Sequence, residues 1–408
     1  MHKINVIGLG YIGLPTCLMF ATHGYSVTGI DYNKELVSKL NLGELTFHEK
    51  GLEGLFKTAQ KSNVRFTSEY EKGTFFIIAV PTPYNKKTKV IDASFVVGAI
   101  ESVMDICEDN SIIVIESTIS PGTIDKFVRP VVNAKEDERS IKVNLVHCPE
   151  RIIPGNMVYE LQNNSRTIGA DSEIVAGEVA NAYRSFCRGN IAITDIKTAE
   201  MTKVVENTYR DINIAFANEL SKIAYEAGID VHEIIRIANM HPRVNILQPG
   251  PGVGGHCISV DPWFLVGDYP SIAKLIWQAR LVNDSMPLFV AERVCEIAKQ
   301  FNIPHDRIGF YGLTYKENVD DYRESPTIQL LEHQHSLLCE NSKVYDPFVQ
   351  KQLYPNQYHD FNQFLNEVDL VVIMQPHDHI KENFALLNDK IVFDTKAAFK
   401  KSNKVFWL

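Results

Sequence analysis

A glycine-rich turn near the start of the chain constrains the fold more than any other feature. The apolar run Lys3–Ile7 has the length of a strand and leads directly into Gly8-Leu9-Gly10-Tyr11-Ile12-Gly13. An apolar helical stretch follows to about His23, and a second strand-like run ends at Asp31. Strand, glycine turn, helix and strand in this order predict a βαβ unit with two parallel strands.

The same unit predicts a dinucleotide-binding site. Its glycines would let the backbone approach a pyrophosphate at the helix N-terminus, and Asp31 could accept hydrogen bonds from a ribose diol. An aspartate at this position favours NAD over NADP, because it would repel the 2′-phosphate. We therefore expect NAD to bind at Gly8, Gly10, Tyr11, Ile12, Gly13 and Asp31.

Three further apolar runs continue the alternation, at 75–80, 111–116 and 143–146. Polar residues follow each of them, among them Thr82, Thr118 and Glu150. Ligands of open parallel sheets bind at the carboxyl ends of the strands, so we expect these three side chains to share one cleft. We assign Thr82 and Thr118 to the predicted cofactor site.

The chain changes character near residue 198. From Thr198 to Ala227 the apolar residues follow a period of about 3.6, and Gly228 is a plausible stop. This pattern predicts one amphipathic helix of about 45 Å. Such a helix can connect two domains and offer a surface for dimerisation.

The last third of the chain repeats the first in outline, with strand-like runs at 307–313, 343–347, 369–374 and 390–395. Its glycine turn lacks the full phosphate fingerprint, so we expect it to bind a nucleotide other than a second NAD. The predicted fold is α/β, with two doubly wound, Rossmann-like domains joined by a long central helix and a helical dimerisation region. The predicted domains are 1–197 (NAD-binding), 198–300 (central, helical) and 301–408 (the second doubly wound domain).

Composition excludes several classes of protein. A chain of 408 residues with 45% hydrophobic composition can form two or three domains, each with its own core. A net charge of -9 argues against a nucleic-acid partner. The chain shows no apolar run long enough for membrane insertion and no cleavage-like signal, so we expect a cytoplasmic protein.

Cysteine and histidine spacings indicate no metal site. The seven cysteines are odd in number and scattered without a C-x-x-C pair, which predicts neither a disulfide framework nor a zinc site. His377 and His379 have no further ligands at a suitable spacing, so we expect a surface loop there.

Cys257 lies in a glycine-rich run, Gly250-Pro251-Gly252-Val253-Gly254-Gly255-His256-Cys257. Glycines permit positive φ and the close approach of a ligand, and a thiol at the start of a following helix would have a lowered pKa. These properties suit a nucleophile. A buried structural cysteine is the alternative, and the local sequence alone favours it.

Ordered motifs along essentially the whole chain resemble those of the UDP-glucose/GDP-mannose 6-dehydrogenase family. They are Gly8-x-Gly10-x-x-Gly13, Val80-Pro81-Thr82-Pro83, Glu116-Ser117-Thr118, Pro149-Glu150-Arg151, Ala199-Glu200-x-x-Lys203-x-x-x-Asn207, Gly254-Gly255-x-Cys257-x-x-x-Asp261 and Arg323-Glu324-Ser325. Within the family, the run from Gly255 to Phe264 most resembles the UDP-N-acetyl-D-mannosamine dehydrogenases. The resemblance assigns 301–408 to UDP-sugar binding.

The resemblance implies a two-step oxidation of a sugar C6 alcohol to a carboxylate, with two NAD per sugar and no metal. The Cys257 thiolate would attack the aldehyde to give a thiohemiacetal, which would lose a second hydride and become a thioester. Water would then release the acid. Such a uronic acid would serve surface polysaccharide biosynthesis, for example of a capsule.

Catalytic roles are also implied by the resemblance. Lys203 and Asn207 lie four residues apart on one helix face and would bind the reacting oxygen. Asp261, with a water held by Lys203, would act as the base in alcohol oxidation. Glu150 would help water attack the thioester, and Thr118 would lie near the nicotinamide and that water.

Each of these residues has a structural alternative. Lys203 would otherwise lie on a solvated helix face, and Asp261 would cap a helix before Pro262, because proline is tolerated only in the first turn. Glu150 would otherwise form a loop salt bridge with Arg151. His256, beside the cysteine, is expected to be structural.

The resemblance also implies the contacts of the sugar nucleotide. Lys316 resembles a UDP-sugar contact and Arg323 a cofactor contact. Arg243 resembles an arginine that reaches a neighbouring subunit's site, so we expect a homodimer or larger homo-oligomer. The substrate site would comprise Glu150, Arg151, Lys203, Asn207, Arg243, Gly254, Gly255 and Lys316.

Two departures move the expected substrate away from UDP-glucose. The glucose enzymes often carry a glutamate at the position of Pro154 and a lysine at that of Val260. UDP-N-acetyl-D-mannosamine is the leading candidate, with UDP-glucose and UDP-N-acetyl-D-glucosamine as alternatives. A non-catalytic NAD-binding regulator and a single-step β-hydroxyacid dehydrogenase are alternatives of other classes, although the latter needs neither the thiol nor the second sheet. Spacing does not reveal the C2 epimer.

Overall fold

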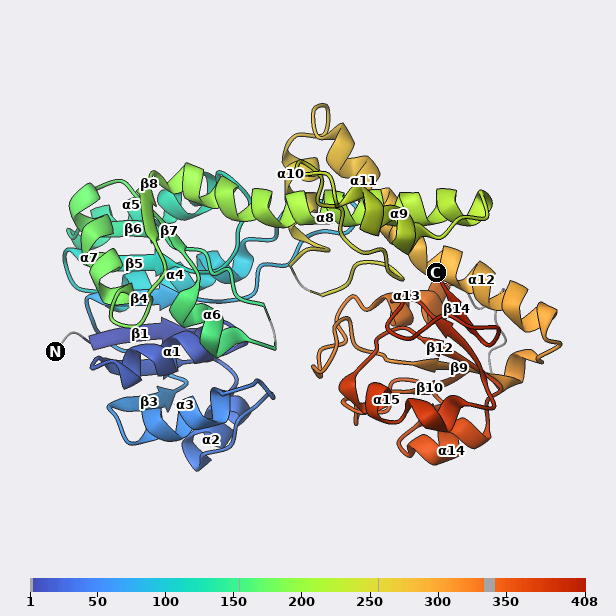
Figure 1. Cartoon of the computed structure of the whole chain (residues 1–408). Coiled ribbons are helices and arrows are strands. Elements are labelled where there is room, and N and C mark those ends of the chain that lie inside the picture. Colours follow the sequence, from blue (N-terminus) through green and yellow to red (C-terminus); the bar gives the residue numbers. More distant parts are fainter. Residues whose placement is uncertain (1–2, 154, 256, 334–341) are drawn as a thin grey trace. The chain divides into compact units, whose positions relative to one another are not determined.

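The computed structural model describes residues 3–153, 155–255, 257–333 and 342–408 (Figure 1). The chain divides into two compact units, 1–206 and 207–408, with the boundary inside a long helix. Each unit is described by itself. The three-domain division with boundaries at 197 and 300 stays a prediction.

The first unit is built on an eight-stranded sheet in the order β3-β2-β1-β4-β5-β6-β7-β8. From β3 to β6 this is the doubly wound order, and neighbouring strands in it are parallel. β7 reverses direction and pairs antiparallel with β6. The strands are β1 Lys3–Ile7, β2 Ser26–Ile30, β3 Val64–Thr67, β4 Phe75–Ile78, β5 Ser111–Ile115, β6 Val143–His147, β7 Arg166–Ala170 and β8 Ile191–Thr194.

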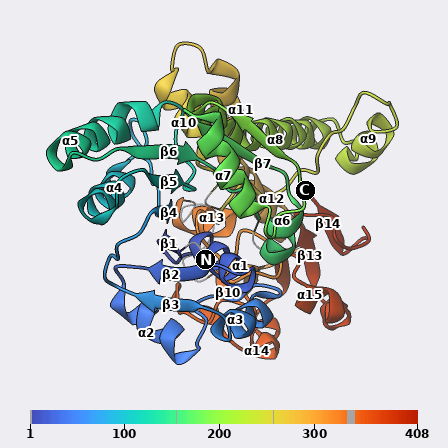
Figure 2. The ribbon, with the colours of Figure 1, turned by 90° about the vertical axis from the view of Figure 1, so that its left-hand side faces the viewer.

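Helices cover both faces of this sheet. Figure 2 shows α4 and α5 on one face and α1 and α6 on the other. Helix α1 is apolar all round because it is buried all round, with Leu14, Leu18 and Phe20 fully enclosed in the core. The helices are α1 Gly13–Thr22, α2 Lys34–Leu42, α3 Leu52–Gln60, α4 Ser94–Ile106, η1 Ile124–Val128, α5 Arg129–Arg139, α6 Met157–Asn163 and α7 Glu173–Tyr183.

Helix α8 spans Ile196–Glu226, which confirms the long helix predicted over 198–227. Gly228, at φ +68°, lets the chain turn back so that the amide of Ile229 donates to the carbonyl of Ala224. Further helices follow: α9 Val231–Ala238, α10 Asp261–Asp268, α11 Lys274–Asp284 and α12 Met286–Gln300.

The second unit contains a parallel six-stranded sheet in the order β11-β10-β9-β12-β13-β14, again the doubly wound order. The prediction of a second doubly wound sheet is thereby confirmed. Phe310, Val372 and Phe393 form the centre of its core. The strands are β9 Ile308–Tyr311, β10 Lys343–Tyr345, β11 Gln357–Tyr358, β12 Leu370–Ile373, β13 Ile391–Asp394 and β14 Val405–Trp407. The helices are η2 His305–Arg307, α13 Pro326–His333, α14 Phe361–Asn366, α15 Asp378–Glu382 and η3 Phe384–Leu387.

Candidate active site

The turn between β1 and α1 requires glycine at two positions and is open at a third. Gly8 has φ +89°, and a Cβ there would lie 2.6 Å from the carbonyl oxygen of Ala79. A Cβ on Gly13 would lie 1.8 Å from the carbonyl oxygen of Gly8. By contrast, a Cβ on Gly10 would meet nothing within 4 Å. The turn is therefore packed on its inner side and accessible at Gly10, which fits a backbone cradle for the pyrophosphate of NAD.

Asp31 fixes the same turn from the end of β2. Its carboxylate accepts hydrogen bonds from the amide of Leu9 (2.8 Å) and from the amide of Asn33 (2.9 Å). Tyr11, within the turn, packs against Phe47 with ring centroids 4.3 Å apart and ring planes tilted by 31°. The predicted ribose-binding carboxylate thus lies beside the predicted pyrophosphate cradle.

Thr82 and Thr118 lie together, as expected for residues after neighbouring strands. The hydroxyl of Thr82 donates to the carbonyl of Thr118 over 2.7 Å. Because β4 and β5 are parallel neighbours, the loops after them meet at one edge of the sheet. This is the carboxyl edge, where the glycine turn after β1 also lies.

Glu150, after β6, is buried and pairs with an arginine that sequence reasoning missed. One carboxylate oxygen accepts from the backbone amide of Arg151 (2.6 Å), and the other accepts from the guanidinium of Arg166 (2.5 Å). The alternative of a Glu150–Arg151 salt bridge is therefore wrong. The Arg151 side chain instead pairs with Glu206 (2.5 Å) and donates to the hydroxyl of Thr167 (3.0 Å).

Glu116, in the motif after β5, also faces the Arg166 guanidinium, at 3.5 Å. The hydroxyl of Tyr183 donates to the same Glu116 carboxyl oxygen over 3.0 Å. Burial raises the pKa of Glu116 to about 7, an effect that the neighbouring guanidinium opposes.

Cys257 is exposed, so the alternative of a buried structural cysteine is wrong. Its carbonyl accepts hydrogen bonds from the amides of Val260 (3.0 Å) and Asp261 (2.8 Å), and α10 begins at Asp261. The thiol therefore lies one turn before α10 and not within its first turn. This placement differs from the expected thiol at a helix start.

Asp261 is buried and faces α8. Its carboxylate accepts a hydrogen bond of 2.6 Å from the side-chain amide of Asn207, which is also buried. Helix α10 has no side-chain cap, so the alternative role of Asp261 as a cap is wrong. Pro262 is accommodated in the first turn, as its chemistry requires.

Lys203 lies one turn before Asn207 on α8 and is buried, with 6% of its surface exposed. The alternative of a solvated helix face is therefore wrong for this residue. Lysine side chains are rarely buried, and a buried lysine does not contribute to solubility. The burial of Lys203 therefore favours a chemical role.

The glycine run before Cys257 is packed tightly against the loop after β9. Gly255 has φ +85°, and a Cβ there would lie 2.7 Å from the ring of Tyr315. A Cβ on Gly254 would lie 2.5 Å from the carbonyl oxygen of Glu324. The amide of Gly255 donates to the carbonyl of Arg323 (3.0 Å), so these two segments form one surface.

Three predicted cationic contacts lie in loops of the second unit. Arg323 is half-exposed and its guanidinium pairs with Asp321 at 2.6 Å. The carbonyl of Lys316 accepts from the hydroxyl of Thr314 (2.9 Å). Arg243 lies in an exposed turn after α9.

His377 is fully buried, so the expected surface loop is wrong at this residue. Its Nε2 lies 3.2 Å from the carboxylate of Asp346, which also accepts from the amides of Leu313 (2.6 Å) and Thr314 (3.1 Å). Asp346 fixes the second glycine turn as Asp31 fixes the first, but it is enclosed beneath an imidazole. In the described part of the chain, no three His, Cys, Asp or Glu residues are grouped as a metal site would need.

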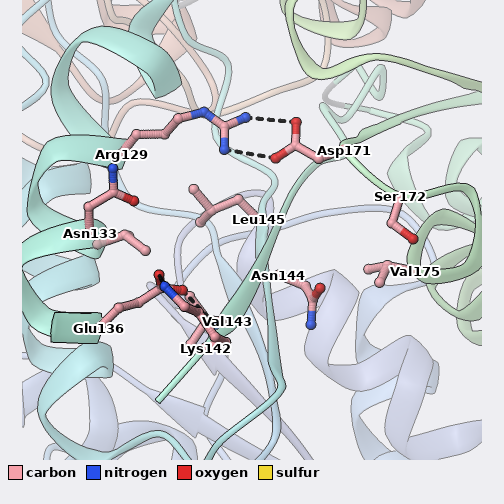
Figure 3. Close-up of a pocket in the computed structure, with 11 residues that line it drawn as sticks. Arg129, Asn133, Glu136, Lys142, Val143, Asn144, Leu145, Asp171, Ser172 and Val175 are labelled. Atoms are coloured by element: carbon pink, nitrogen blue, oxygen red, sulfur yellow. Dashed lines mark hydrogen bonds and ion pairs between the residues drawn. The ribbon is translucent and has the colours of Figure 1, made fainter. Parts of the chain in front are cut away.

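A shallow cavity of about 270 Å³ lies elsewhere on the first unit (Figure 3). It is lined by residues of α5, of β6 and of the turn before α7, and Arg129 pairs across it with Asp171 at 2.7 Å. None of the predicted site residues lines it.

Comparison with known proteins decides the family. Models of the UDP-glucose/GDP-mannose dehydrogenase family match residues 2–187 (NAD binding domain), 197–285 (central domain) and 309–401 (UDP binding domain). The chain belongs to this family. It is an NAD-dependent dehydrogenase of nucleotide sugars, and the resemblance inferred from its motifs is confirmed.

Individual members of the family align with this dehydrogenase over nearly its full length. The UDP-N-acetyl-D-mannosamine dehydrogenase of Methanococcus maripaludis is 44% identical over 97% of this chain and 93% of the relative. An NDP-N-acetyl-D-galactosaminuronic acid dehydrogenase of Ralstonia nicotianae is 38% identical, over 97% and 96% respectively. The structure of the UDP-N-acetyl-mannosamine dehydrogenase of Staphylococcus aureus superposes with a TM-score of 0.88 at 39% identity, covering 99% of this chain and 97% of that one.

Two positions interpreted in the sequence of this dehydrogenase, Pro154 and His256, lie outside the described residues. Val260, where the glucose enzymes often carry a lysine, is buried directly before α10. None of the helices among the described residues combines the length and apolar character that crossing a membrane requires.

Proposed function

We propose that this dehydrogenase oxidises the C6 alcohol of UDP-N-acetyl-D-mannosamine to the carboxylate, with two NAD per sugar and no metal, in the cytoplasm. The product would feed surface polysaccharide biosynthesis, such as that of a capsule. One observation carries the proposal. The thiol of Cys257 is exposed, and four residues later the buried carboxylate of Asp261 accepts a hydrogen bond from Asn207. That arrangement supplies a nucleophile beside a polar pair able to hold and deprotonate an alcohol.

In the first step, Lys203 and Asn207 bind the C6 oxygen, and Asp261 accepts its proton through a water held by Lys203. Bound NAD supplies a hydride acceptor in each of the two oxidations. We place it at the glycine turn, with Asp31 at the ribose, Thr82 and Thr118 near the nicotinamide, and Arg323 as a further contact. The product of this step is an aldehyde.

In the second step, the Cys257 thiolate adds to the aldehyde carbon, and the thiohemiacetal loses a hydride to become a thioester. Glu150 then assists water in attacking the thioester carbon, which breaks the C–S bond and releases the acid and the free thiol. In total, one water and two NAD convert the alcohol to the carboxylate, with two NADH and three protons released. The remaining predicted substrate contacts are Arg151, Arg243, Gly254, Gly255 and Lys316.

Relatives support the acetamido sugar but differ in its configuration. The names of the Methanococcus and Staphylococcus proteins specify mannosamine, whereas the name of the Ralstonia protein specifies galactosaminuronic acid. A direct test supplies purified protein and NAD with UDP-N-acetyl-D-mannosamine, UDP-N-acetyl-D-glucosamine, UDP-N-acetyl-D-galactosamine and UDP-glucose. We expect the highest kcat/KM for the mannosamine compound and a uronic acid product by mass spectrometry. A higher kcat/KM for another sugar would overturn the substrate assignment.

A homodimer is part of the proposal. Tyr209, Phe216 and Ile223 lie seven residues apart on α8, so they share one helix face, and each is more than half exposed (68%, 56% and 57%). An apolar stripe of this kind is typical of a protein–protein interface. We propose that a second copy of the chain packs against this stripe and contributes its Arg243 to the substrate site.

A further inference from the structure

Arg166 reaches the carboxyl edge of the first sheet because β7 runs against its neighbour. His147 of β6 pairs with Gly169 of β7, and Val146 pairs with Ala170. Continuing this antiparallel register brings the first residue of β7 beside the loop that follows β6. A parallel strand would instead begin at the opposite edge of the sheet.

The guanidinium of Arg166 is held between two acids in the interior of the first unit. It is 3% exposed, donates to Glu150 at 2.5 Å, and lies 3.5 Å from Glu116. Its carbon lies 4.4 Å from the centroid of the Tyr183 ring, which covers one side of it. The arginine therefore has little freedom to turn.

Arg166 supplies the positive charge of this cluster. The other titratable groups that face it are Glu116, Glu150, Tyr183 and the Cys148 thiol. Burial raises the pKa of Cys148 to about 12, so the thiol is neutral. Burial also raises the pKa of Tyr183 well above its usual value. One cation thus faces two carboxyl groups, and the raised pKa of Glu116, about 7, means that it holds a proton below neutral pH.

We propose that Arg166 is a positioning residue for thioester hydrolysis, which orients the Glu150 carboxylate toward the attacking water while Glu116 holds the guanidinium from its other side. This inference rests on the proposed function. It separates the hydrolysis from the two oxidations, because Arg166 touches Glu150 and not the groups assigned to hydride transfer.

Single-turnover kinetics of Arg166→Met test the proposal. We expect a normal burst of two NADH per active site, followed by a steady-state kcat lowered about 10- to 100-fold, by analogy with the loss of a hydrogen-bond partner that orients a metal ligand. Intact-protein mass spectrometry should show the sugar acyl adduct on Cys257. Arg166→Lys, which keeps the charge but loses the planar fork, should recover part of the rate. Arg184→Met, at the exposed arginine directly after α7, is the matched control and should leave both phases unchanged.

Glu116→Gln provides a second test of the proposal if the arginine variants do not fold. Glutamine mimics the protonated carboxyl, so the variant should hydrolyse the thioester at pH 6 within twofold of the wild-type rate. Any change in rate that titration of Glu116 causes near pH 7 should be absent from the variant. The positioning role is overturned if folded Arg166→Met loses burst and steady state equally without an adduct, or if Glu116→Gln slows the burst of NADH as much as the steady state. One NADH per sugar from the wild type would instead refute the proposed function itself.

Discussion

At Gly255 the backbone leaves no room for a side chain. Its positive φ and the Tyr315 ring 2.7 Å from a virtual Cβ are independent reasons for glycine. The sequence predicted a place of close approach in this run, and Gly255 provides it. Its closest neighbour within the protein, however, is an aromatic side chain 60 residues along the chain, and no local pattern specifies such a contact.

Gly255→Ala should displace the segment that carries Cys257. A shift of about 1 Å at a reacting group can cost about 100-fold in rate, so we expect kcat to fall by about that factor while NAD binding is retained. The measurement is kcat with the preferred UDP-sugar, beside NAD affinity by calorimetry. Gly177→Ala is the control, because a Cβ there meets nothing within 4 Å and helix α7 should tolerate it. A kcat within twofold of wild type would contradict the tight packing inferred for Gly255.

The burial and the pairing of charged residues could not be predicted from the sequence. The motifs located Lys203, Glu150 and Asp261, but their burial could not be read from spacing. Arg166 carried no signal at all, because the reversed direction of β7 and the resulting pairing with Glu150 are set by tertiary contacts.

At the scale of elements, strands with a clear apolar run were predictable, and β7 and β8 were not. Apolar runs marked β1, β2, β4, β5 and β6 within a few residues, as they did β9, β10, β12 and β13. β7 has the sequence Arg-Thr-Ile-Gly-Ala, in which a buried arginine and a glycine obscure any apolar pattern. β8, Ile-Ala-Ile-Thr, has only four residues and two of them are exposed, so its apolar run is too short to mark a strand.

The end of β6 should make the first unit sensitive to acid. His147 is fully buried, and burial lowers its pKa from the ordinary 6.5 to about 3. Protonation then favours the unfolded chain, so the stability contributed by the neutral ring is complete above pH 6.5 and is lost as the pH falls toward 3.

His147→Phe removes that titration. Nε2 has no hydrogen-bond partner, and Nδ1 lies 2.9 Å from the carbonyl of Ile115, so the variant loses one hydrogen bond worth about 1 kcal/mol at neutral pH. Below pH 5 it should unfold at higher urea concentration than the wild type. Equal acid dependence in the two proteins would show that His147 does not control this transition.

Helix α11 is joined to α8 by a buried ion pair. Arg280, 2% exposed, donates to the carboxylate of Asp211 at 2.6 Å. Arg280→Met leaves that carboxylate buried without its cation, so we expect a loss of about 3–5 kcal/mol in the free energy of unfolding. Asp211→Leu combined with Arg280→Met should recover most of the loss, because no buried charge remains. A double variant no more stable than the single one, by urea denaturation, would contradict this.

At the scale of the whole molecule, two doubly wound sheets of the same strand order were predictable from the repeated pattern of runs and turns. Their difference was only partly predictable. Both glycine turns are fixed by an aspartate from the next strand, Asp31 or Asp346, but only the second aspartate is enclosed under a histidine. That enclosure depends on a side chain from beyond β12 and is invisible in the turn's own sequence.

The apolar stripe on α8 predicts a dimer that one charge should disrupt. Phe216→Glu places a carboxylate in the centre of the stripe, so light scattering should show a 46.1 kDa monomer where the wild type has twice that mass. Ile174→Glu, on a still more exposed apolar residue of α7, should leave the dimer intact. A dimeric Phe216→Glu protein would place the interface elsewhere.

The ratio of NADH formed to UDP-sugar consumed, with the sugar limiting, tests the four-electron mechanism most directly. We predict two NADH per sugar for the wild type, and for Cys257→Ala retained NAD binding without formation of the carboxylate. A ratio of one in the wild type, or a ratio of two with full turnover in Cys257→Ala, would contradict a covalent oxidation on this thiol.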